Sequence, residues 1–569
     1  MTGSGAPRAA RARHRVAGGL IEWALVTVSG IILTTWFTYP LVFRMDRLGR
    51  TDSADGQFSI WNVAWVARTV VADPLQLFDA NIFYPHRGAL AFSEANLGAG
   101  LLAVPAYWVT RNAFTAHNFS VVVAFTLSVV ASYYLVRYVT NSRGAAAVSC
   151  VLYAFCPFVF ARTAHIQLQM VFPLPLCLLA MHRFVDAQTA GRTVLLGVAL
   201  AVQAAFSAYF AVLAGLLVAL GVVYYGAIGG RWRRRRYWVA STVAAGVALL
   251  LVLPLFLPYV RLQRTTGFSR ALIESYDFSA DWRAYLASNA RFHTWMLPLL
   301  KKWNEVLFPG MLATGLGLAG LWVGLRSKDP DTDQRTRAHA LYYALVGGFA
   351  LWASVGPAAG LYTFLFHTIP VFSWLRAPAR FGIGVTLALV VFAGIAVARC
   401  LRRQPQLRSI SLAALLVLGA LVDLHLPSLP YQEVEPVPAV YGALRNQPPG
   451  AVVDFPFFQR HIFRYHTLYM VNSTVHWRPL VNGYSDYFPP DFRETAGILA
   501  LFPDAEGLAL LRERGVRYAI VHLNRYPPAD RAAVLQRLDQ HRASLKPLAL
   551  MKDTLLYEID GAVSLQGTP

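Results

Sequence analysis

Long apolar stretches separated by short polar segments set the pattern of this chain. A helix needs roughly 20 apolar residues to cross a hydrocarbon core about 30 Å thick, because it rises about 1.5 Å per residue. The pattern therefore predicts about eleven transmembrane helices, the first of them retained because no small-residue cleavage site follows it. They are expected at 18–43, 118–138, 145–160, 171–181, 194–207, 209–226, 239–260, 308–325, 339–355, 381–400 and 411–426.

Arginines between the apolar stretches predict the orientation, since short basic loops stay in the cytoplasm. One orientation places every basic segment on that side, with a cytoplasmic N-terminus and an external C-terminus. The basic segments are 8–15, 137–143, 183–192, 231–236, 326–337 and 399–408. The apolar stretch 97–109 is too short to cross and contains Pro105. We expect it to lie in the membrane interface as a juxtamembrane helix.

The sequence changes character from Pro427 onward. A proline-rich segment is followed by strand-like runs such as GAVVDFP and VRYAIVHL, with helical patterns such as 532–542 between them. We therefore predict a polytopic α-helical membrane protein with a soluble C-terminal α/β domain. Its parts are a cytoplasmic tail 1–17, a transmembrane domain 18–426 with external loops 44–117 and 261–307, and an external, periplasmic domain 427–569.

Composition supports the membrane prediction and excludes nucleic acid. Of the 569 residues, 56% are hydrophobic and only 14% are charged, which is rare in a water-soluble chain of this length. The net charge of +21 comes from arginines in short loops rather than on one amphipathic face. The cysteines show neither a disulfide framework nor zinc spacing; they are Cys150, Cys156, Cys177 and Cys400.

Acidic residues follow the first predicted span directly. Asp46, Asp52 and Asp55 open the first external loop, and an amphipathic stretch comes after them. Its Trp61 and Trp65 are expected to rest on the membrane surface with their indoles at headgroup level. Ionisable groups beside a bilayer are costly and need a reason. The loop therefore presents a candidate catalytic carboxylate.

The first 230 residues or so resemble the GT-C superfamily of membrane-embedded glycosyltransferases, which includes protein O-mannosyltransferases and the lipid A aminoarabinose transferases. The likeness is one of layout: one span, a long external loop with an acidic residue and juxtamembrane helices, then paired spans. In those families an aromatic residue follows the acid, as Phe58 and Trp61 follow Asp55 here. The chain is also similar to a set of bacterial membrane proteins with the same tail. The resemblance implies a GT-C-like fold in a bacterial cytoplasmic (inner) membrane.

Two positions differ from the family pattern. The paired acids of the family read Asp55-Gly56 here, and the second external turn, acidic in several members, presents His165. No cofactor is certain from the sequence, and a divalent metal is left open, although the residues do not support one bridged by two carboxylates. His165 is a candidate substrate contact, although a lone histidine in such a turn also fits a loop hydrogen bond.

Sugar transfer from a polyprenyl phosphate to a hydroxyl needs a base for the acceptor proton and positive charge on the departing phosphate. Asp55 is the candidate base and Asp52 the next choice; a helix cap is the alternative for Asp55. Arginine forks bind phosphate bidentately. Four external arginines are candidates for this role, and lipid headgroup contact is their alternative: Arg376, Arg380, Arg261 and Arg264. His86 and Glu94 are candidate acceptor contacts.

The sequence thus predicts an inverting glycosyltransferase of the EC 2.4 class. Its partners would be a lipid-linked sugar donor and an envelope glycan, lipid or protein acceptor on the external face. Two alternatives stay open: a transporter or flippase of envelope lipids, and a catalytically silent scaffold with the same fold. The ionisable residues lie mainly outside the spans, and the chain has no clear internal repeat, which favours an enzyme over a transporter.

Overall fold

The computed structural model describes residues 6–300, 306–326, 330–427 and 429–561. Parts of the predicted N-terminal tail, of loop 261–307, of the basic segment 326–337 and of the C-terminal domain lie outside these ranges. The described chain forms two compact units, one made of 1–43, 120–256 and 269–430 and the other of 44–119, 257–268 and 431–569. We call them the helical unit and the mixed unit.

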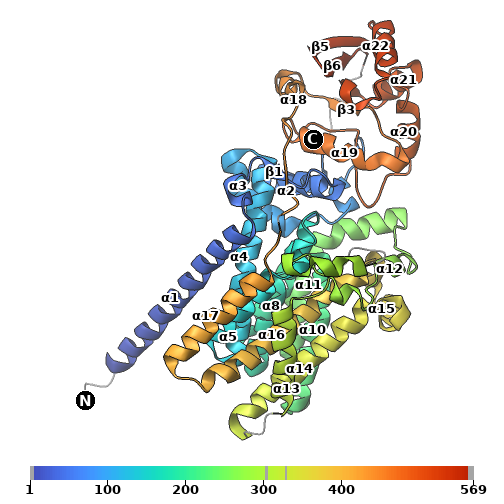
Figure 1. Ribbon diagram of the computed structural model, residues 1–569. Coiled ribbons are helices and arrows are strands. Elements are labelled where there is room, and N and C mark those ends of the chain that lie inside the picture. The colour runs from blue at the N-terminus through green and yellow to red at the C-terminus, as the bar shows by residue number, and fades with distance from the viewer. Residues whose placement is uncertain (1–5, 301–305, 327–329, 428, 562–569) are drawn as a thin grey trace. The chain divides into compact units, whose positions relative to one another are not determined.

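Helices make up the helical unit (Figure 1). Two of its helices, α4 and α11, also extend into the mixed unit. The helices are α1 (Ala6–Phe37), α4 (Ala113–Thr140), α5 (Arg143–Ala154), α6 (Pro157–Phe160), α7 (Ile166–Gln169), α8 (Pro173–Asp186), α9 (Ala190–Phe206), α10 (Ala208–Ile228), α11 (Arg235–Thr266), α12 (Glu274–Asp277), α13 (Met311–Arg326), α14 (Pro330–Ser354), α15 (Leu361–Thr368), α16 (Gly382–Arg402) and α17 (Gln406–Asp423).

The predicted polytopic helical architecture is confirmed. Each predicted span falls on a helix, and 7 helices of the described chain are long and apolar enough to cross a membrane. The predicted spans 171–181, 194–207 and 308–325 correspond to helices of 14, 17 and 16 residues, which are shorter than that criterion. The span 339–355 corresponds to α14, whose first turns, PDTDQRTRAH, are polar.

Glycines allow close packing at the centre of the helical unit, where α13 lies against α16. A Cβ on Gly320 would lie 1.8 Å from the backbone oxygen of Phe392, and one on Gly317 would lie 2.8 Å from Leu389. Small residues at such spacing let two transmembrane helices approach until their backbones touch. The close α13–α16 contact therefore depends on these two glycines.

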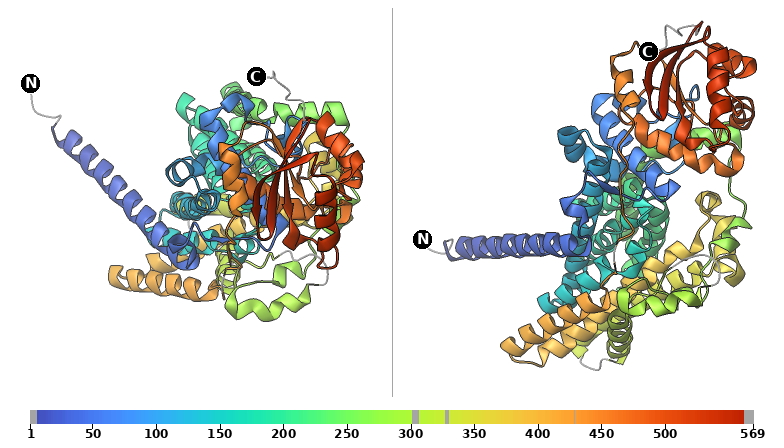
Figure 2. Two further views of the ribbon diagram at one scale, coloured as in Figure 1. Left: turned by 90° about the horizontal axis from the view of Figure 1, so that it is seen from above. Right: turned by 45° about the horizontal axis from the view of Figure 1, so that its top comes forward.

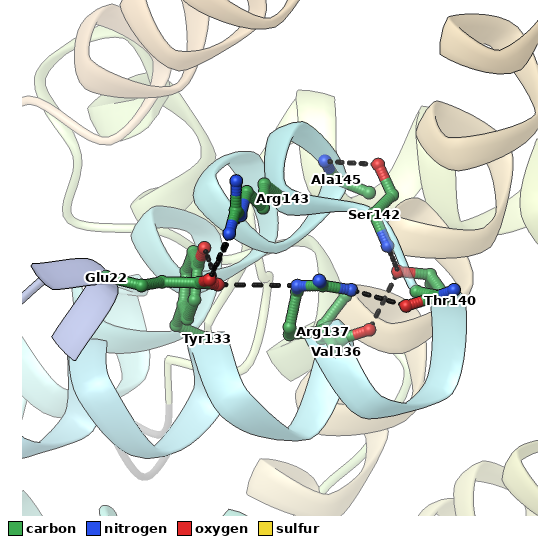
Figure 3. Close-up of polar contacts among 9 residues, drawn as sticks. Glu22, Tyr133, Val136, Arg137, Thr140, Ser142, Arg143 and Ala145 are labelled. Carbon is green, nitrogen blue, oxygen red and sulfur yellow. Dashed lines mark hydrogen bonds and ion pairs between the residues drawn. The ribbon is translucent and has the colours of Figure 1, made fainter. Parts of the chain in front are cut away.

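An ionic cluster joins α1 to the corner between α4 and α5 (Figure 3). Glu22 Oε1 accepts hydrogen bonds from the Tyr133 hydroxyl at 2.9 Å and from Arg137 Nε at 3.3 Å, and Oε2 lies 2.8 Å from Arg143 Nη2. Charged groups inside an apolar layer need partners of this kind. Elsewhere α1 exposes large apolar side chains such as Trp23. The cluster therefore anchors α1 near the middle of its length.

The mixed unit contains the remaining elements, and its four-stranded sheet has the order β3-β4-β6-β5. Strand β4 is parallel to β3 and antiparallel to β6, which is antiparallel to β5. Figure 2 shows α21 and α22 along one side of this sheet. The elements are β1 (Leu48–Gly49), α2 (Ala54–Ala72), α3 (Leu97–Thr110), β2 (Gln432–Glu433), α18 (Ala439–Ala443), β3 (Ala451–Phe455), α19 (His466–Ser473), α20 (Phe492–Leu499), α21 (Ala505–Glu513), β4 (Val516–His522), α22 (Arg531–Gln540), β5 (Leu545–Met551) and β6 (Thr554–Ile559).

The loop 44–117 and the C-terminal region share this unit. Strand β1 of the loop pairs with β2, with Leu48 opposite Glu433. The backbone nitrogen of Leu480 donates to the oxygen of Asn81 at 2.8 Å, and that of Tyr84 donates to the oxygen of Leu480 at 2.9 Å. Because Leu480 also bridges to Val452 of β3, the loop extends the pairing of the sheet. The predicted small α/β domain at the C-terminus is confirmed, and it folds together with the loop.

The prediction that Trp61 and Trp65 rest on the membrane surface is wrong. Both indoles are buried inside the mixed unit, at 0% and 6% exposure. Trp61 Nε1 donates to Asn81 Oδ1 at 3.1 Å and Trp65 Nε1 donates to the Leu77 oxygen at 2.9 Å. These partners compensate the polar end of each ring, so that both can enter the core. The predicted juxtamembrane stretch 97–109 is observed as helix α3.

Buried neutral histidines make the mixed unit sensitive to acid. Burial lowers the pKa of His466 to about 4, and burial with the charges of Arg478 and Arg445 lowers that of His476 to about 3. His466 lies between the Phe458 oxygen, which accepts a hydrogen bond from Nε2, and Asn482 Nδ2, which donates to Nδ1. A second ring proton would therefore face a donor. Folding thus favours the neutral ring.

We expect the stability contributed by these two histidines to be present above pH 6.5 and to be lost as the pH falls toward 4. In that window the unfolded chain binds protons that the folded chain does not, at about 1.4 kcal/mol per pH unit for each histidine. The thermal unfolding midpoint of the purified protein in detergent should therefore decrease when the pH is lowered from 7 to 5. The His466→Gln variant should show a smaller fall, and an equal fall in both proteins would contradict this account.

Candidate functional site

The first turn of α2 presents Asp55. Ser53 is the N-cap residue in extended conformation, and Asp55 is the acidic residue of the first turn, where a helix N-terminus favours negative charge. The side chain is half-buried. The position agrees with both functions predicted for it, a catalytic carboxylate and a helix-terminal charge.

Gly56 lets the loop before α2 fold back over this turn. A Cβ at position 56 would lie 2.3 Å from the backbone oxygen of Arg50. No side chain fits there without moving the backbone, which explains why position 56 is a glycine. Gly56 therefore sets the geometry of the turn that presents Asp55.

We expect Gly56→Ala to destabilise the mixed unit by about 1–3 kcal/mol, as overpacking of a tight contact does. Gly497→Ala in α20 is the matched control, because a Cβ there meets nothing within 4 Å. It should be neutral or stabilising by about 0.5–1 kcal/mol, since alanine is the better helix former. Thermal unfolding midpoints of the two purified variants compare the effects. Equal midpoints would mean that the turn can relax around a methyl group.

The two candidate bases have different surroundings. Asp52 forms a two-pronged ion pair with Arg50, with Nε–Oδ1 at 2.9 Å and Nη2–Oδ2 at 3.2 Å. Asp55 accepts a hydrogen bond from the Tyr484 hydroxyl at 3.2 Å. A carboxylate bound through both oxygens is a fixed ion-pair partner. Asp55 remains the first candidate base and Asp52 the second.

Residues far along the chain complete this turn, and sequence reasoning missed them. Tyr484 lies 429 positions after Asp55. Gln57 Nε2 donates to the Thr51 oxygen at 2.6 Å, while Gln57 Oε1 accepts from Thr467 Oγ1 at 2.6 Å. No local pattern could have identified Tyr484 or Thr467, since their role depends on the pairing of the loop with the C-terminal region.

The other two predicted residues of this loop, His86 and Glu94, form contacts within the protein. His86 Nε2 lies 2.9 Å from Asp491 Oδ1, and the same carboxylate binds Arg514 at 3.1 Å. The backbone oxygen of Glu94 accepts hydrogen bonds from Asn62 and Asn96. Their predicted contact with an acceptor remains a prediction.

Arg261 and Arg264 lie in the last turns of α11, and both are exposed. They share the mixed unit with the first loop. The nearby Tyr259 hydroxyl accepts from the Ala95 nitrogen at 2.8 Å and donates to the Ser93 oxygen at 3.1 Å. The end of α11 is thus tied to the loop segment that precedes α3.

The helical unit holds the other predicted residues. Arg376 lies 5.2 Å from the centre of the Phe278 ring, and Arg380 lies 5.1 Å from that of Tyr209. The Arg380 Nε atom is buried and has no hydrogen-bond partner in the described chain. His165 is half-buried at the start of α7, where its backbone nitrogen donates to the oxygen of Arg162 at 3.0 Å.

Arg162 is a buried arginine that sequence reasoning also missed. Its side chain is 6% exposed, lies 3.7 Å from the centre of the Phe158 ring, and donates from Nη1 to the oxygens of Phe158 and Val306 at 2.8 and 3.2 Å. Burial and the charge of Arg380 lower the pKa of Arg162 to about 9. An arginine in a turn between two apolar spans is the signal that could have identified it.

The structure therefore groups the predicted residues by unit. Six lie in the mixed unit: Asp52, Asp55, His86, Glu94, Arg261 and Arg264. Three lie in the helical unit, together with Arg162: His165, Arg376 and Arg380. Within the described residues, no group of three or more His, Cys, Asp or Glu side chains is arranged to hold a metal ion.

Fold and residues define a multi-pass helical membrane protein with a small mixed-sheet domain. The chain belongs to the family described as "Domain of unknown function (DUF6311)", whose model matches residues 28–424. No curated protein matches the chain.

Solved structures give similarities at low identity. ArnT from Cupriavidus metallidurans bound to undecaprenyl phosphate has a TM-score of 0.49 and 15% identity, over 96% of this chain and 99% of that one. The same protein in the apo state gives 0.39 and 13%, over 96% and 99%. The Archaeoglobus fulgidus oligosaccharyltransferase, in complex with Zn and sulfate, gives 0.45 and 13%, over 94% of this chain and 72% of that one.

Proposed function

We propose that this protein transfers a sugar from a polyprenyl-phosphate donor to an envelope acceptor on the external face of the cytoplasmic membrane. The main support is the half-buried Asp55 carboxylate, displayed on the first turn of the helix that opens the first external loop. The layout resemblance to GT-C transferases points to the same residue. Asp52, whose two oxygens bind Arg50, is the second candidate base.

The reaction would be an inverting displacement. Asp55 takes the proton of an acceptor hydroxyl, the acceptor oxygen forms a bond to the anomeric carbon, and the bond from that carbon to the phosphate oxygen breaks. The electron pair of the broken bond leaves with the polyprenyl phosphate, which gains negative charge. A base within hydrogen-bond reach of the hydroxyl contributes about 10²–10⁴-fold to such a step.

The arginines of the helical unit would stabilise the leaving phosphate. Arg380 and Arg162 are close enough for the charge of one to lower the pKa of the other. Bringing two like charges together in an apolar setting is costly, and binding a phosphate offsets the cost. The phosphate gains charge as the bond breaks, so these cations would act most strongly in the transition state. Arg376 is the third candidate cation of the same unit.

A deletion strain tests this proposal. Mass spectrometry of its envelope glycans, glycolipids and glycoproteins should show the loss of one sugar, which the wild-type gene restores. That loss would identify the sugar and the acceptor together. An unchanged set of glycans, with purified protein that moves undecaprenyl phosphate across a vesicle bilayer without a covalent product, would overturn the proposal in favour of a lipid transporter.

A further inference from the structure

We infer that Tyr484, in the C-terminal region, is a positioning residue for the Asp55 base. The inference rests on the proposed function and adds a role for the C-terminal region in the reaction itself. It predicts that the C-terminal domain takes part in the reaction, because one of its side chains would orient the carboxylate that takes the proton.

The geometry fixes one oxygen of the carboxylate. The Tyr484 hydroxyl donates to Asp55 Oδ1 at 3.2 Å. A hydrogen bond from a neutral donor to an ionised acceptor is stronger than one between neutral groups. Aspartate can turn about two side-chain bonds, and a donor on one oxygen restricts the second of them. The direction in which the carboxylate faces an acceptor hydroxyl therefore depends on the phenol.

Aromatic packing holds the phenol itself in place. The Tyr484 ring lies edge-on to Phe58 and to Phe488, each at 6.2 Å between ring centres. Phe488 in turn packs on Phe463 at 5.1 Å and on Phe492 at 5.7 Å. Edge-to-face pairs at these distances are favourable. The hydroxyl is thus held by the aromatic core of the mixed unit rather than by a mobile surface loop.

A second contact holds the backbone on which Asp55 sits. Thr467 of α19 donates to Gln57 Oε1, and Gln57 Nε2 donates to the Thr51 oxygen, both at 2.6 Å. The C-terminal region therefore holds the first turn of α2 through Gln57 and the Asp55 side chain through Tyr484. Two contacts from separate segments of the C-terminal region thus act on the same turn.

A purely structural contact is the alternative, and the chain offers a matched control for it. Tyr487 belongs to the same segment as Tyr484, and its ring packs on Phe92 at 5.1 Å and on Phe268 at 5.6 Å. Tyr484→Phe and Tyr487→Phe each remove one hydroxyl and keep the ring. Only the first removes a hydrogen bond to Asp55.

The experiment measures product formation over time by full-length variants expressed to equal levels in the deletion strain, with the sugar product quantified by mass spectrometry. We expect Tyr484→Phe to slow formation about tenfold or more, because small misplacements of a reacting group cost up to about 10²-fold. Tyr487→Phe should stay within about twofold of wild type. Thermal unfolding midpoints of both purified variants should match that of the wild type.

A double variant distinguishes a role of Tyr484 in orienting the Asp55 carboxylate from a role in stabilising the fold. Asp55→Glu keeps a carboxylate and moves its oxygens by one methylene, so the phenol no longer sets their direction. Adding Tyr484→Phe to Asp55→Glu should therefore cost much less than adding it to the wild type. An equal cost in both backgrounds would assign Tyr484 a structural role and overturn the inference.

The outcomes also distinguish this inference from the proposed function. If Asp55→Asn stops product formation while Tyr484→Phe leaves it at the wild-type rate, the positioning role is wrong and the base assignment stands. If Asp55→Asn leaves the rate unchanged, the base assignment fails, and the role of Tyr484 fails with it.

Discussion

Asp55→Asn is expected to lower sugar transfer by about 10²–10⁴-fold, the range that a positioned general base contributes. Asparagine keeps the shape of the side chain and can still accept the hydrogen bond from Tyr484, but it cannot take a proton. Folding should therefore be preserved while the chemistry is lost. Quantifying the sugar product in deletion-strain membranes that carry the variant measures the effect.

Asp52→Asn is the matched control, since it makes the same chemical change three positions earlier. Its carboxylate is bound to Arg50 through both oxygens, so its loss should affect the stability of the turn more than the reaction. We expect product formation within a few-fold of wild type. If Asp52→Asn abolished transfer and Asp55→Asn did not, the roles of the two carboxylates would have to be exchanged.

The helices could be predicted from the sequence because a bilayer imposes a length and an apolar composition on each crossing segment. Every predicted span lies on a helix of the structure. The boundaries were less predictable, because a helix can continue beyond its apolar segment into exposed polar turns. The polar start of α14 shows this, since a hydropathy window alone places its span from His339 onward.

The joining of the first loop to the C-terminal region could not be predicted in the same way. Pairing of β1 with β2 brings together residues almost 400 positions apart, and no local pattern encodes such a contact. The same cause explains the error over Trp61 and Trp65. Their spacing fits a helix lying on a membrane, but the face they form is covered by partners such as Asn81, which the sequence does not place there.

At the candidate site, the residue types could be predicted from the sequence, whereas the contacts that distinguish the two carboxylates could not. Asp52 and Asp55 follow the same span, but Asp52 is exposed and paired with Arg50, whereas Asp55 is half-buried and accepts a hydrogen bond from Tyr484. Arg162 was missed because it is a lone arginine in the turn 161–170, whereas Arg376 and Arg380 form a pair that fits phosphate binding.

Arg380→Gln is expected to lower transfer by about 10²–10³-fold, the cost of removing one group that stabilises developing charge. Arg380 is suited to this role because its Nε atom is buried without a hydrogen-bond partner in the described chain, and because its charge acts on Arg162. A glutamine keeps hydrogen-bonding groups near this position and removes the charge. Removing that charge should weaken the binding of undecaprenyl phosphate to the purified protein in nanodiscs.

Arg403→Gln is the control, since Arg403 is exposed just after the opposite end of the same helix, α16. It should bind undecaprenyl phosphate and form product as the wild type does.

The phosphate is most negative after the bond to the sugar has broken, so Arg380 should act on the charge of the lipid. Arg380→Gln should therefore strongly reduce product formation, but it should reduce the binding of a neutral polyprenol of the same length much less. Equal loss for the charged and the neutral lipid would mean that Arg380 shapes the site for the isoprenoid chain, and the leaving phosphate would then need another cation.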